Sequence, residues 1–231
     1  MPASSEMTSL RRPAANDPFA RIAAIGVVPV IAIENAEDAI PLADALLEGG
    51  LPVAEITFRT KAAARVLAKL SAERPHLLAG AGTVLDLASL EAARESGAQF
   101  AVAPGFDARI VEAAAKRGFS FAPGVMTPSD ISAAAAHGVR VAKFFPAGAA
   151  GGPKALEAIA APFAHLGFAF MPTGGVSFDN LDDWLKLNSV IAVGGTWIAR
   201  PQDIREGRFA EIAKRARAAM EKAKALREAR A

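Results

Sequence analysis

The chain has 231 residues, of which 52% are hydrophobic and 22% are charged, and its formal net charge is +2. A chain of this length can bury the core of one domain. It contains no cysteine, which excludes disulfides, thiolate metal sites and cysteine nucleophiles. The sequence has no basic stripe with interleaved aromatic residues and no apolar stretch as long as a membrane span, so neither nucleic acid nor a membrane is an expected partner.

Both ends of the chain are polar. Residues 1–17 lack the continuous apolar segment of a signal peptide, and we interpret them as a flexible N-terminal extension of a cytoplasmic protein. The folded domain then covers residues 18–231. From residue 205 to residue 230, acidic and basic side chains alternate in a way that is typical of a solvated helix face.

Short apolar runs alternate with alanine-rich amphipathic segments along the rest of the chain. A short helix is predicted at residues 18–25. The predicted strands cover residues 27–33, 53–58, 77–83, 100–104, 120–125, 139–145, 169–173 and 190–194. The predicted helices that follow them cover residues 36–48, 61–74, 87–96, 107–117, 128–136, 153–161, 178–186 and 204–225.

Residues that cap helices support these boundaries. Glycine is favoured directly after a helix, and it stands there as Gly50, Gly97, Gly118 and Gly138. Thr127, followed by proline, and Ser177 stand where N-caps are expected. Apolar strands that alternate with helices indicate parallel pairing with both sheet faces covered. Eight such units without a linker predict a single α/β domain, a (β/α)8 TIM barrel with a short N-terminal helix, and an open doubly wound sheet is the alternative.

Lys143 lies inside an apolar run, residues 139–146, that otherwise has the character of a buried strand. An ammonium group loses hydration in an apolar site, and the neutral amine formed when it releases its proton is a nucleophile towards carbonyl carbon. A strand lysine can also protect a sheet edge or extend its ammonium group into solvent. The polar residues elsewhere in the chain favour the catalytic interpretation.

Polar residues gather where the predicted strands end, and a (β/α)8 barrel carries its active site at this end. Glu55, Thr57 and Arg59 share one parity at the end of the second strand, and Thr83 ends the third. Glu55 facing Lys143 would be a general base, and a purely structural buried ion pair is the alternative. Arg59 and Thr83 carry the groups that clamp a carboxylate, and the alternatives are a surface arginine and a helix N-cap.

Glycine-rich segments follow the seventh and eighth predicted strands, at Gly174–Gly175 and at Gly194–Gly195–Thr196. Either segment alone is a weak signal, because strand-to-helix turns use glycine for conformational reasons. Together they match the phosphate site of many barrels, in which backbone N–H groups bind the anion. We therefore expect a substrate that carries a phosphate group.

The three histidines, His76, His137 and His165, fall in loops on the amino-terminal side of the predicted strands. A metal-dependent aldolase would bring histidines together at the opposite end. We therefore expect these three residues at the surface, and we expect no metal and no other cofactor.

The aromatic residues have a different expected role. Trp184 and Trp197 are expected to be packing residues rather than ligands. Phe144 and Phe145 have opposite parity on one strand, so one of them faces the helices and the other lines the site beside the amine.

Several motifs occur in the order that is found in one enzyme family: Val27-Val-Pro-Val-Ile31, Glu55-Ile-Thr-Phe-Arg-Thr60, Gly80-Ala-Gly-Thr83, Lys143-Phe-Phe-Pro-Ala147, Pro172-Thr-Gly-Gly-Val176 and Gly194-Gly-Thr-Trp197. Residues 19–224 resemble the bacterial 2-keto-3-deoxy-6-phosphogluconate (KDPG) aldolases, class I enzymes that also act as 4-hydroxy-2-oxoglutarate (KHG) aldolases. The resemblance implies a metal-free barrel that assembles as a homotrimer. It also implies cleavage of KDPG, a phosphorylated 2-keto acid, to pyruvate and glyceraldehyde 3-phosphate.

The resemblance also implies a role for each motif residue. Lys143 would form the Schiff base, Glu55 would be the general acid and base, and Arg59 with Thr83 would hold the pyruvate carboxylate. The other implied site residues are Pro104, Phe145 and Thr173 along the pocket and Gly174, Gly175, Gly195 and Thr196 at the phosphate. The alternatives are an aldolase for the galactonate epimer, an oxaloacetate decarboxylase, and a non-catalytic barrel that binds a sugar phosphate.

Overall fold

The structure is a computed structural model, and it describes residues 17–229. The predicted N-terminal extension lies outside the described residues except for Asp17, whose side chain accepts a hydrogen bond of 3.0 Å from the backbone N–H of Phe19 and caps the first helix. The strands are β1 (Val27–Ile31), β2 (Val53–Thr57), β3 (Leu78–Gly82), β4 (Phe100–Val102), β5 (Phe121–Ala122), β6 (Gly124–Val125), β7 (Val141–Phe144), β8 (Ala169–Pro172) and β9 (Val193–Gly195).

Helices follow most of the strands, as expected for a chain in which apolar strands alternate with amphipathic segments. The α-helices are α1 (Pro18–Ile25), α2 (Ala39–Glu48), α3 (Ala63–Glu73), α4 (Leu87–Glu95), α5 (Ala108–Lys116), α6 (Pro128–Ala136), α7 (Gly152–Ala160), α8 (Leu181–Leu185), α9 (Pro201–Arg205) and α10 (Phe209–Glu228). Two 3-10 helices, η1 (Ala36–Asp38) and η2 (Ala161–Leu166), adjoin α2 and α7.

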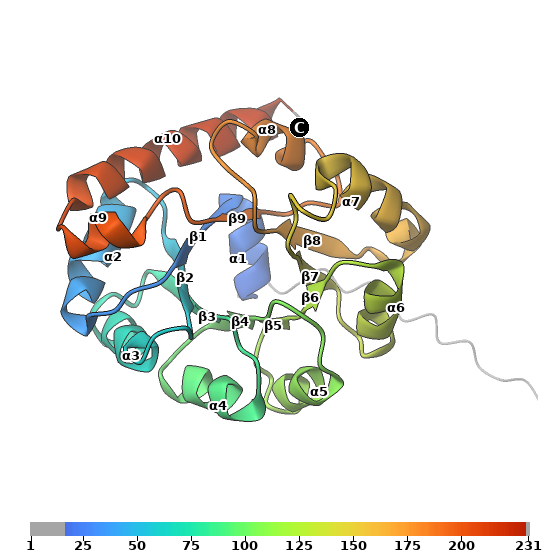
Figure 1. Cartoon of the computed structure of the whole chain (residues 1–231), viewed down its shortest axis with the longest axis horizontal. Coiled ribbons are helices and arrows are strands. Elements are labelled where there is room, and N and C mark those ends of the chain that lie inside the picture. Colours follow the sequence, from blue (N-terminus) through green and yellow to red (C-terminus); the bar gives the residue numbers. More distant parts are fainter. Residues whose placement is uncertain (1–16, 230–231) are drawn as a thin grey trace, which may run out of the picture.

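The strands form two parallel sheets with the orders β5-β4-β3-β2-β1-β9 and β6-β7-β8. The first strand pairs with the last, because Val27 of β1 lies opposite Val193 of β9. An isolated parallel bridge between Thr173 and Gly194 connects the end of β8 to β9. Figure 1 shows the strands as an inner layer with the helices arranged around them. The fold is therefore a parallel α/β fold, and its strands are apolar because both of their faces are covered.

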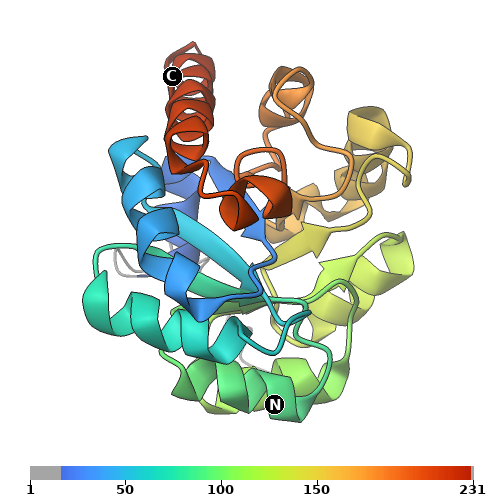
Figure 2. The ribbon, with the colours of Figure 1, turned by 60° about the vertical axis from the view of Figure 1, so that its left-hand side comes forward.

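The longest helix, α10, packs beside α2, as Figure 2 shows for these two helices. Small residues make this close approach possible. Ala213 and Ala216 of α10 are buried, and a Cβ atom placed on Gly49 at the end of α2 would lie 2.5 Å from the Cβ of Ala216. Trp184 of α8 is 1% exposed, so its predicted packing role is confirmed.

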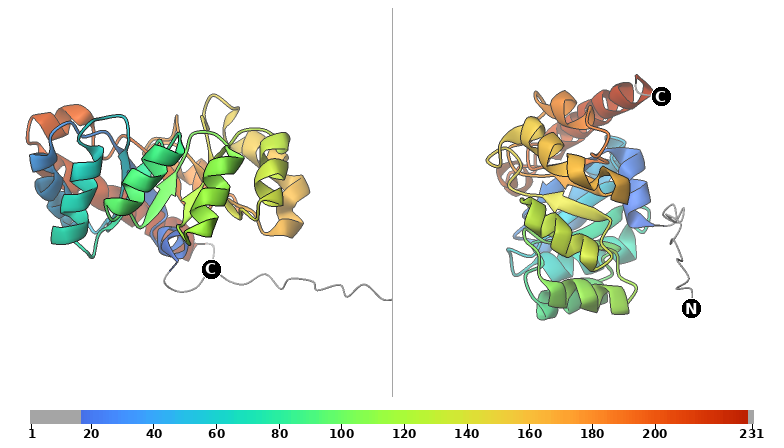
Figure 3. Two further views of the ribbon diagram at one scale, coloured as in Figure 1. Left: turned by 90° about the horizontal axis from the view of Figure 1, so that it is seen from below. Right: turned by 90° about the vertical axis from the view of Figure 1, so that its right-hand side faces the viewer.

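Helix α1 lies at the end of the strands at which β1 begins (Figures 1 and 3). The Phe19 ring contacts the Phe100 ring edge to face, with 6.1 Å between centroids. Arg227 near the end of α10 donates hydrogen bonds to the carbonyl groups of Ala23 and Ala24. Helix α1 is therefore fixed over the amino-terminal end of the strands, and the opposite end stays open for polar side chains.

Two predicted elements are each divided in the structure. The strand predicted at residues 120–125 is interrupted at Pro123, which has no N–H to give to a sheet, and its halves β5 and β6 belong to different sheets. The helix predicted at residues 204–225 is interrupted by a turn at Gly207, where φ is 66°, and forms α9 and α10.

The helix caps agree with the prediction except at one position. Gly50, Gly97, Gly118 and Gly138 all have positive φ, and Thr127 forms a capping box at the start of α6. Ser177 is not the cap of α8, because that helix begins later and Asn180 precedes its first residue. Among the helices of residues 17–229, none is long and apolar enough to cross a membrane.

Candidate active site

The carboxyl ends of the strands surround a cavity of about 240 Å³. Parallel α/β proteins bind ligands at this end, because the loops that follow the strands meet there. All residues that the sequence analysis placed in the site line this cavity, namely Glu55, Arg59, Thr83, Pro104, Lys143, Phe145, Thr173, Gly174, Gly175, Gly195 and Thr196. The cavity is also lined by Val30, Thr57 and Val176, none of which was predicted as a site residue from the sequence.

Lys143 and Glu55 form a buried ion pair beside the cavity. Lys143 comes from β7 and Glu55 from β2, and their side chains are 7% and 4% exposed. Lys143 Nζ donates a hydrogen bond of 2.9 Å to Glu55 Oε1. Burial removes both groups from water, so each serves as the counter-charge of the other. A proton that moves along this hydrogen bond leaves a neutral amine next to a carboxylic acid, which are the two groups that imine formation requires.

Gly82 makes room for the Glu55 carboxylate. A Cβ atom placed on Gly82 would lie 2.1 Å from Glu55 Oε1, which is far inside van der Waals contact. Gly82 lies on β3, in register with Thr57 of the neighbouring strand β2. The glycine therefore allows the carboxylate to lie against the β3 backbone while it receives the hydrogen bond from Lys143.

Thr57 positions Arg59. The Thr57 hydroxyl donates a hydrogen bond of 2.9 Å to the Ile31 carbonyl at the end of β1, and it accepts one of 3.3 Å from Arg59 Nε. Thr57 is 1% exposed. The sequence contained a signal for this residue, because Thr57 shares the parity of Glu55 and Arg59, although it was not assigned to the site.

Thr83 has a backbone conformation that is unusual for a threonine. Its φ is 61°, in the left-handed region, where a β-branched side chain is strained. The alternative role as a helix cap is wrong, because Asp86 caps α4 through a hydrogen bond of 2.7 Å from the Ser89 N–H. Thr83 instead lines the cavity together with Arg59.

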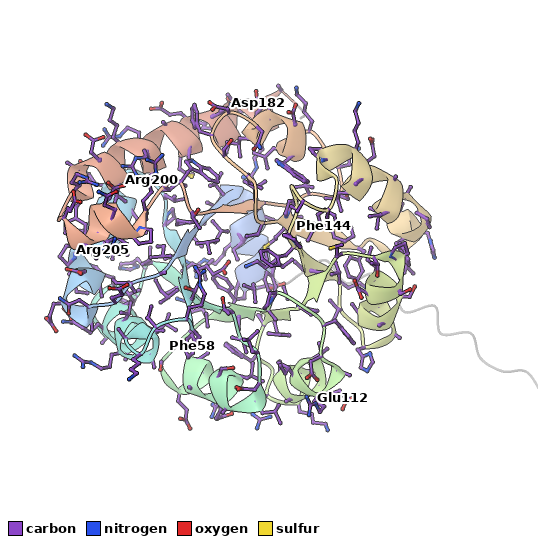
Figure 4. All side chains as sticks on the ribbon, viewed as in Figure 1. Phe58, Glu112, Phe144, Asp182, Arg200 and Arg205 are labelled. Atoms are coloured by element: carbon purple, nitrogen blue, oxygen red, sulfur yellow. The ribbon has the colours of Figure 1, made fainter. Side chains whose placement is uncertain are left out.

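The two neighbouring phenylalanines divide as predicted. Phe145 lines the cavity, and its ring centroid lies 5.8 Å from Lys143 Nζ. Phe144 is fully buried in the core, and Figure 4 labels it beside the strands. The Phe145 ring therefore forms an apolar wall of the cavity next to the Lys143 amine.

The two glycine-rich segments lie on neighbouring strand ends, because Thr173 bridges to Gly194. The carbonyl of Gly174 accepts a hydrogen bond of 2.7 Å from Gly148, which connects the loops after β8 and β7. A Cβ atom on Gly195 would lie 1.6 Å from the Trp197 ring, so only glycine fits there. The predicted packing role of Trp197 is therefore confirmed.

The histidines lie outside the cavity. His76, His137 and His165 are exposed, as predicted, and none of them is among the lining residues. His137 Nε2 lies 3.6 Å from a carboxylate oxygen of Glu112, which Figure 4 shows on the outer ring of helices. Within residues 17–229, no group of three or more His, Cys, Asp or Glu side chains is arranged to hold a metal ion.

Most of the chain is similar in sequence to known aldolases. The sequence model of the KDPG and KHG aldolase family matches residues 20–215. The 2-dehydro-3-deoxy-phosphogluconate aldolase of Haemophilus influenzae is 44% identical over 80% of this chain and 87% of that protein. The KHG/KDPG aldolase of Escherichia coli is 42% identical over 86% of this chain and 92% of that protein.

Solved structures show the same similarity. A Legionella pneumophila KDPG aldolase, crystallised with pyruvate as a covalent carbinolamine intermediate, superposes with a TM-score of 0.83 at 38% identity and covers 87% of this chain and 97% of that chain. A KDPGal structure superposes with a TM-score of 0.76 at 25% identity and covers 88% of this chain and 95% of that chain.

Fold and site together define a class, namely enzymes of parallel α/β fold that act on carbonyl compounds through a lysine amine. The comparisons identify the group within that class. The chain belongs to the KDPG and KHG aldolase family, whose members are carbon–carbon lyases.

Proposed function

We propose that the chain is a class I aldolase that cleaves KDPG to pyruvate and glyceraldehyde 3-phosphate through a Schiff base on Lys143. The observation that carries the proposal is the buried hydrogen bond between Lys143 and Glu55 at the cavity of an aldolase-family fold. A buried ion pair of this kind is costly when it has no use. This cost argues against a non-catalytic sugar-phosphate-binding barrel.

We further propose that the two sheets form one closed (β/α)8 barrel, in a single domain that begins at residue 18. The pairing of β1 with β9 and the bridge between Thr173 and Gly194 support closure on one side. On the other side, the backbone N–H of Gly124 in β6 donates a hydrogen bond of 3.0 Å to the Gly105 carbonyl after β4. An open doubly wound sheet would instead place the first strand in the middle and far from the last.

The reaction begins when the ammonium group of Lys143 gives a proton to Glu55. The neutral amine attacks the C2 ketone of the substrate and forms a carbinolamine. Glu55 returns its proton to the carbinolamine hydroxyl, which leaves as water, and an iminium ion forms. Each proton transfer uses the 2.9 Å separation between Nζ and Oε1, or one water molecule beside it.

The iminium ion then accepts electrons from the bond that breaks. Glu55, again a carboxylate, takes the proton of the C4 hydroxyl, the C3–C4 bond breaks, and glyceraldehyde 3-phosphate leaves. The electron pair of the broken bond forms an enamine on Lys143. Protonation of the enamine carbon and hydrolysis of the imine release pyruvate and restore the amine.

The two ends of the cavity would bind the two charged ends of the substrate. Arg59, oriented by Thr57, and the Thr83 hydroxyl would hold the carboxylate. Gly174, Gly175, Gly195 and Thr196 would hold the phosphate through backbone N–H groups and a hydroxyl. Binding energy gained at the phosphate, remote from the breaking bond, orients the reacting carbon.

The gluconate epimer is the preferred substrate in this proposal, because the identity to the KDPG aldolase structure is 38% and that to the KDPGal structure is 25%. KHG is a second proposed substrate, since the relative from Escherichia coli is a KHG/KDPG aldolase at 42% identity. The homotrimer and the cytoplasmic location stay predictions from the family resemblance.

The test of the proposed chemistry is covalent trapping. Incubation with pyruvate and borohydride should reduce the imine to a stable adduct, and peptide mass mapping should find it on Lys143. Lys143→Ala should abolish the adduct, whereas Lys154→Ala, which removes an exposed lysine of α7, should leave it unchanged. An adduct that persists in Lys143→Ala would refute the assignment of the nucleophile.

A further inference from the structure

The loop after β9 leads from the proposed phosphate site to the outside of the fold. Gly195, the last residue of β9, and Thr196, the first residue of the loop, line the cavity, and the loop continues through Trp197 to α9. The Trp197 ring turns back beneath Gly195, where any side chain would collide with it at 1.6 Å. The position of Gly195 and Thr196 therefore depends on how the Trp197 backbone is held.

Arg215 of α10 holds this backbone. Its Nη1 donates hydrogen bonds to the carbonyl groups of Trp197 and Ile198, at 3.2 Å and 3.0 Å. These two carbonyl groups belong to the consecutive peptide units Trp197–Ile198 and Ile198–Ala199, which begin one residue after Thr196. Because peptide units are planar and rigid, holding these two units fixes φ and ψ of Ile198 and restricts the movement of the chain segment that leads into the phosphate site.

Asp203 of α9 in turn holds Arg215. Arg215 Nη2 lies 2.7 Å from Asp203 Oδ2, and Arg208 Nε donates a hydrogen bond of 2.7 Å to Asp203 Oδ1. Asp203 is 3% exposed. Burial disfavours its charged form, but the hydrogen bonds and charges of Arg208 and Arg215 outweigh this effect, so the pKa of this carboxyl lies below its usual range. Asp203 thus stays ionised and balances the charge of Arg215.

We propose that Arg215, anchored by Asp203, is a positioning residue that fixes the phosphate-binding loop and thereby sets the preference for phosphorylated over unphosphorylated substrates. The inference rests on the proposed function. Arg215 does not line the cavity, and its charge is balanced by Asp203, so it acts through the backbone of the loop. A guanidinium group suits this role because its rigid planar fork can bind a carboxylate and carbonyl groups at the same time.

The test compares KM and kcat for KDPG, which carries a phosphate, and for KHG, which does not. Arg215→Gln should raise KM for KDPG by about tenfold and weaken competitive inhibition by inorganic phosphate to a similar extent. Both kinetic constants for KHG should stay within about twofold of wild type. Equal losses on the two substrates, or no loss on KDPG, would overturn the proposal.

The matched control is Arg217→Gln on the same helix. It removes the same charge, but Arg217 donates to the Glu48 carbonyl of α2 at 3.2 Å rather than to the loop. This variant should keep the wild-type KM for KDPG, and a tenfold rise there would show that a general loss of charge explains the result. Arg215→Lys keeps the charge but lacks the planar fork, so its KM for KDPG should stay clearly above the wild-type value. A wild-type KM for KDPG in Arg215→Lys would overturn the positioning role. This second variant keeps the test decisive if Arg215→Gln does not fold.

Thr196→Ala separates this inference from the proposed function. It removes a hydroxyl from the proposed phosphate site itself, so it should raise KM for KDPG by a larger factor than KM for KHG. If Thr196→Ala is selective and Arg215→Gln is not, only the role of Arg215 fails. If wild-type protein forms no borohydride adduct with pyruvate, the proposed function fails, and the inference fails with it.

Discussion

Glu55 and Asp203 are equally buried, each with 3% of its surface exposed, but their partners differ. Glu55 is paired with Lys143, a cation that can lose its proton, and it faces a cavity. Asp203 is paired with Arg208 and Arg215, which keep their charge at any physiological pH, and it lies outside the cavity lining. The first pair can exchange a proton, whereas the second is permanently charged. A buried carboxylate that is paired with lysine can therefore take part in proton transfer, whereas one that is paired with arginine serves only to hold the structure together.

Replacing each carboxylate by its amide should give opposite results and is the strongest test of this comparison. Glu55→Gln should lower kcat by about 10²–10⁴-fold, because general acid and base catalysis is lost, while some pyruvate is still trapped by borohydride. Asp203→Asn should leave KHG turnover within about twofold but lower the free energy of unfolding by about 3 kcal/mol, because a buried ion network loses its anion. Turnover assays and denaturant titrations measure the two effects. Near-normal turnover in Glu55→Gln would remove its catalytic role.

The space that Gly82 leaves for Glu55 allows a subtler change. Gly82→Ala should push the Glu55 carboxylate away from its place beside Lys143, because the new Cβ would lie 2.1 Å from Oε1. We expect kcat to fall by about tenfold or more, since small misplacements of a catalytic group are costly. If circular dichroism shows that this variant is folded and its kcat equals that of wild type, then catalysis does not depend on the exact position of the Glu55 carboxylate.

The smallest expected effect concerns Thr57. Thr57→Val keeps the shape of the side chain but removes the hydroxyl that joins the Ile31 carbonyl to Arg59. The concentration of pyruvate that gives half-maximal trapping should rise about fivefold, because the hydrogen bond of about 1 kcal/mol that orients Arg59 is lost. Thr57→Ser, which restores the hydroxyl, should recover most of the affinity. If it does not, the methyl group rather than the hydrogen bonds is what matters.

Most residues that line the cavity could be predicted, because two regular features of parallel strands are visible in the sequence. Side chains alternate between the two faces of a strand, and functional residues gather at the carboxyl ends. Lys143 and Glu55 were therefore conspicuous as charged residues inside apolar runs. The glycine segments at the ends of β8 and β9 could be predicted because an anion site needs exposed backbone N–H groups.

Long-range features were not predictable in the same way. The alternating charges after residue 205 have the pattern of a solvated helix face, yet Arg208 and Arg215 lie partly buried against Asp203. A buried charge on a helix has the same local sequence as an exposed one, and only the packing of α10 against α9 distinguishes them. The interruption of the predicted strand at Pro123 and of the predicted helix at Gly207 was not predictable either, because it depends on long-range packing of the two halves.

The left-handed backbone conformation of Thr83 couples substrate binding to the thermal stability of the protein. A β-branched residue with φ of 61° costs roughly 1–3 kcal/mol of folding free energy relative to a relaxed conformation. Glycine at this position would relieve the strain and make the protein more heat-resistant, but it would remove the hydroxyl from the carboxylate end of the cavity. Selection for heat resistance alone would therefore favour glycine at position 83 and weaken substrate binding. Selection for turnover would retain the strained threonine.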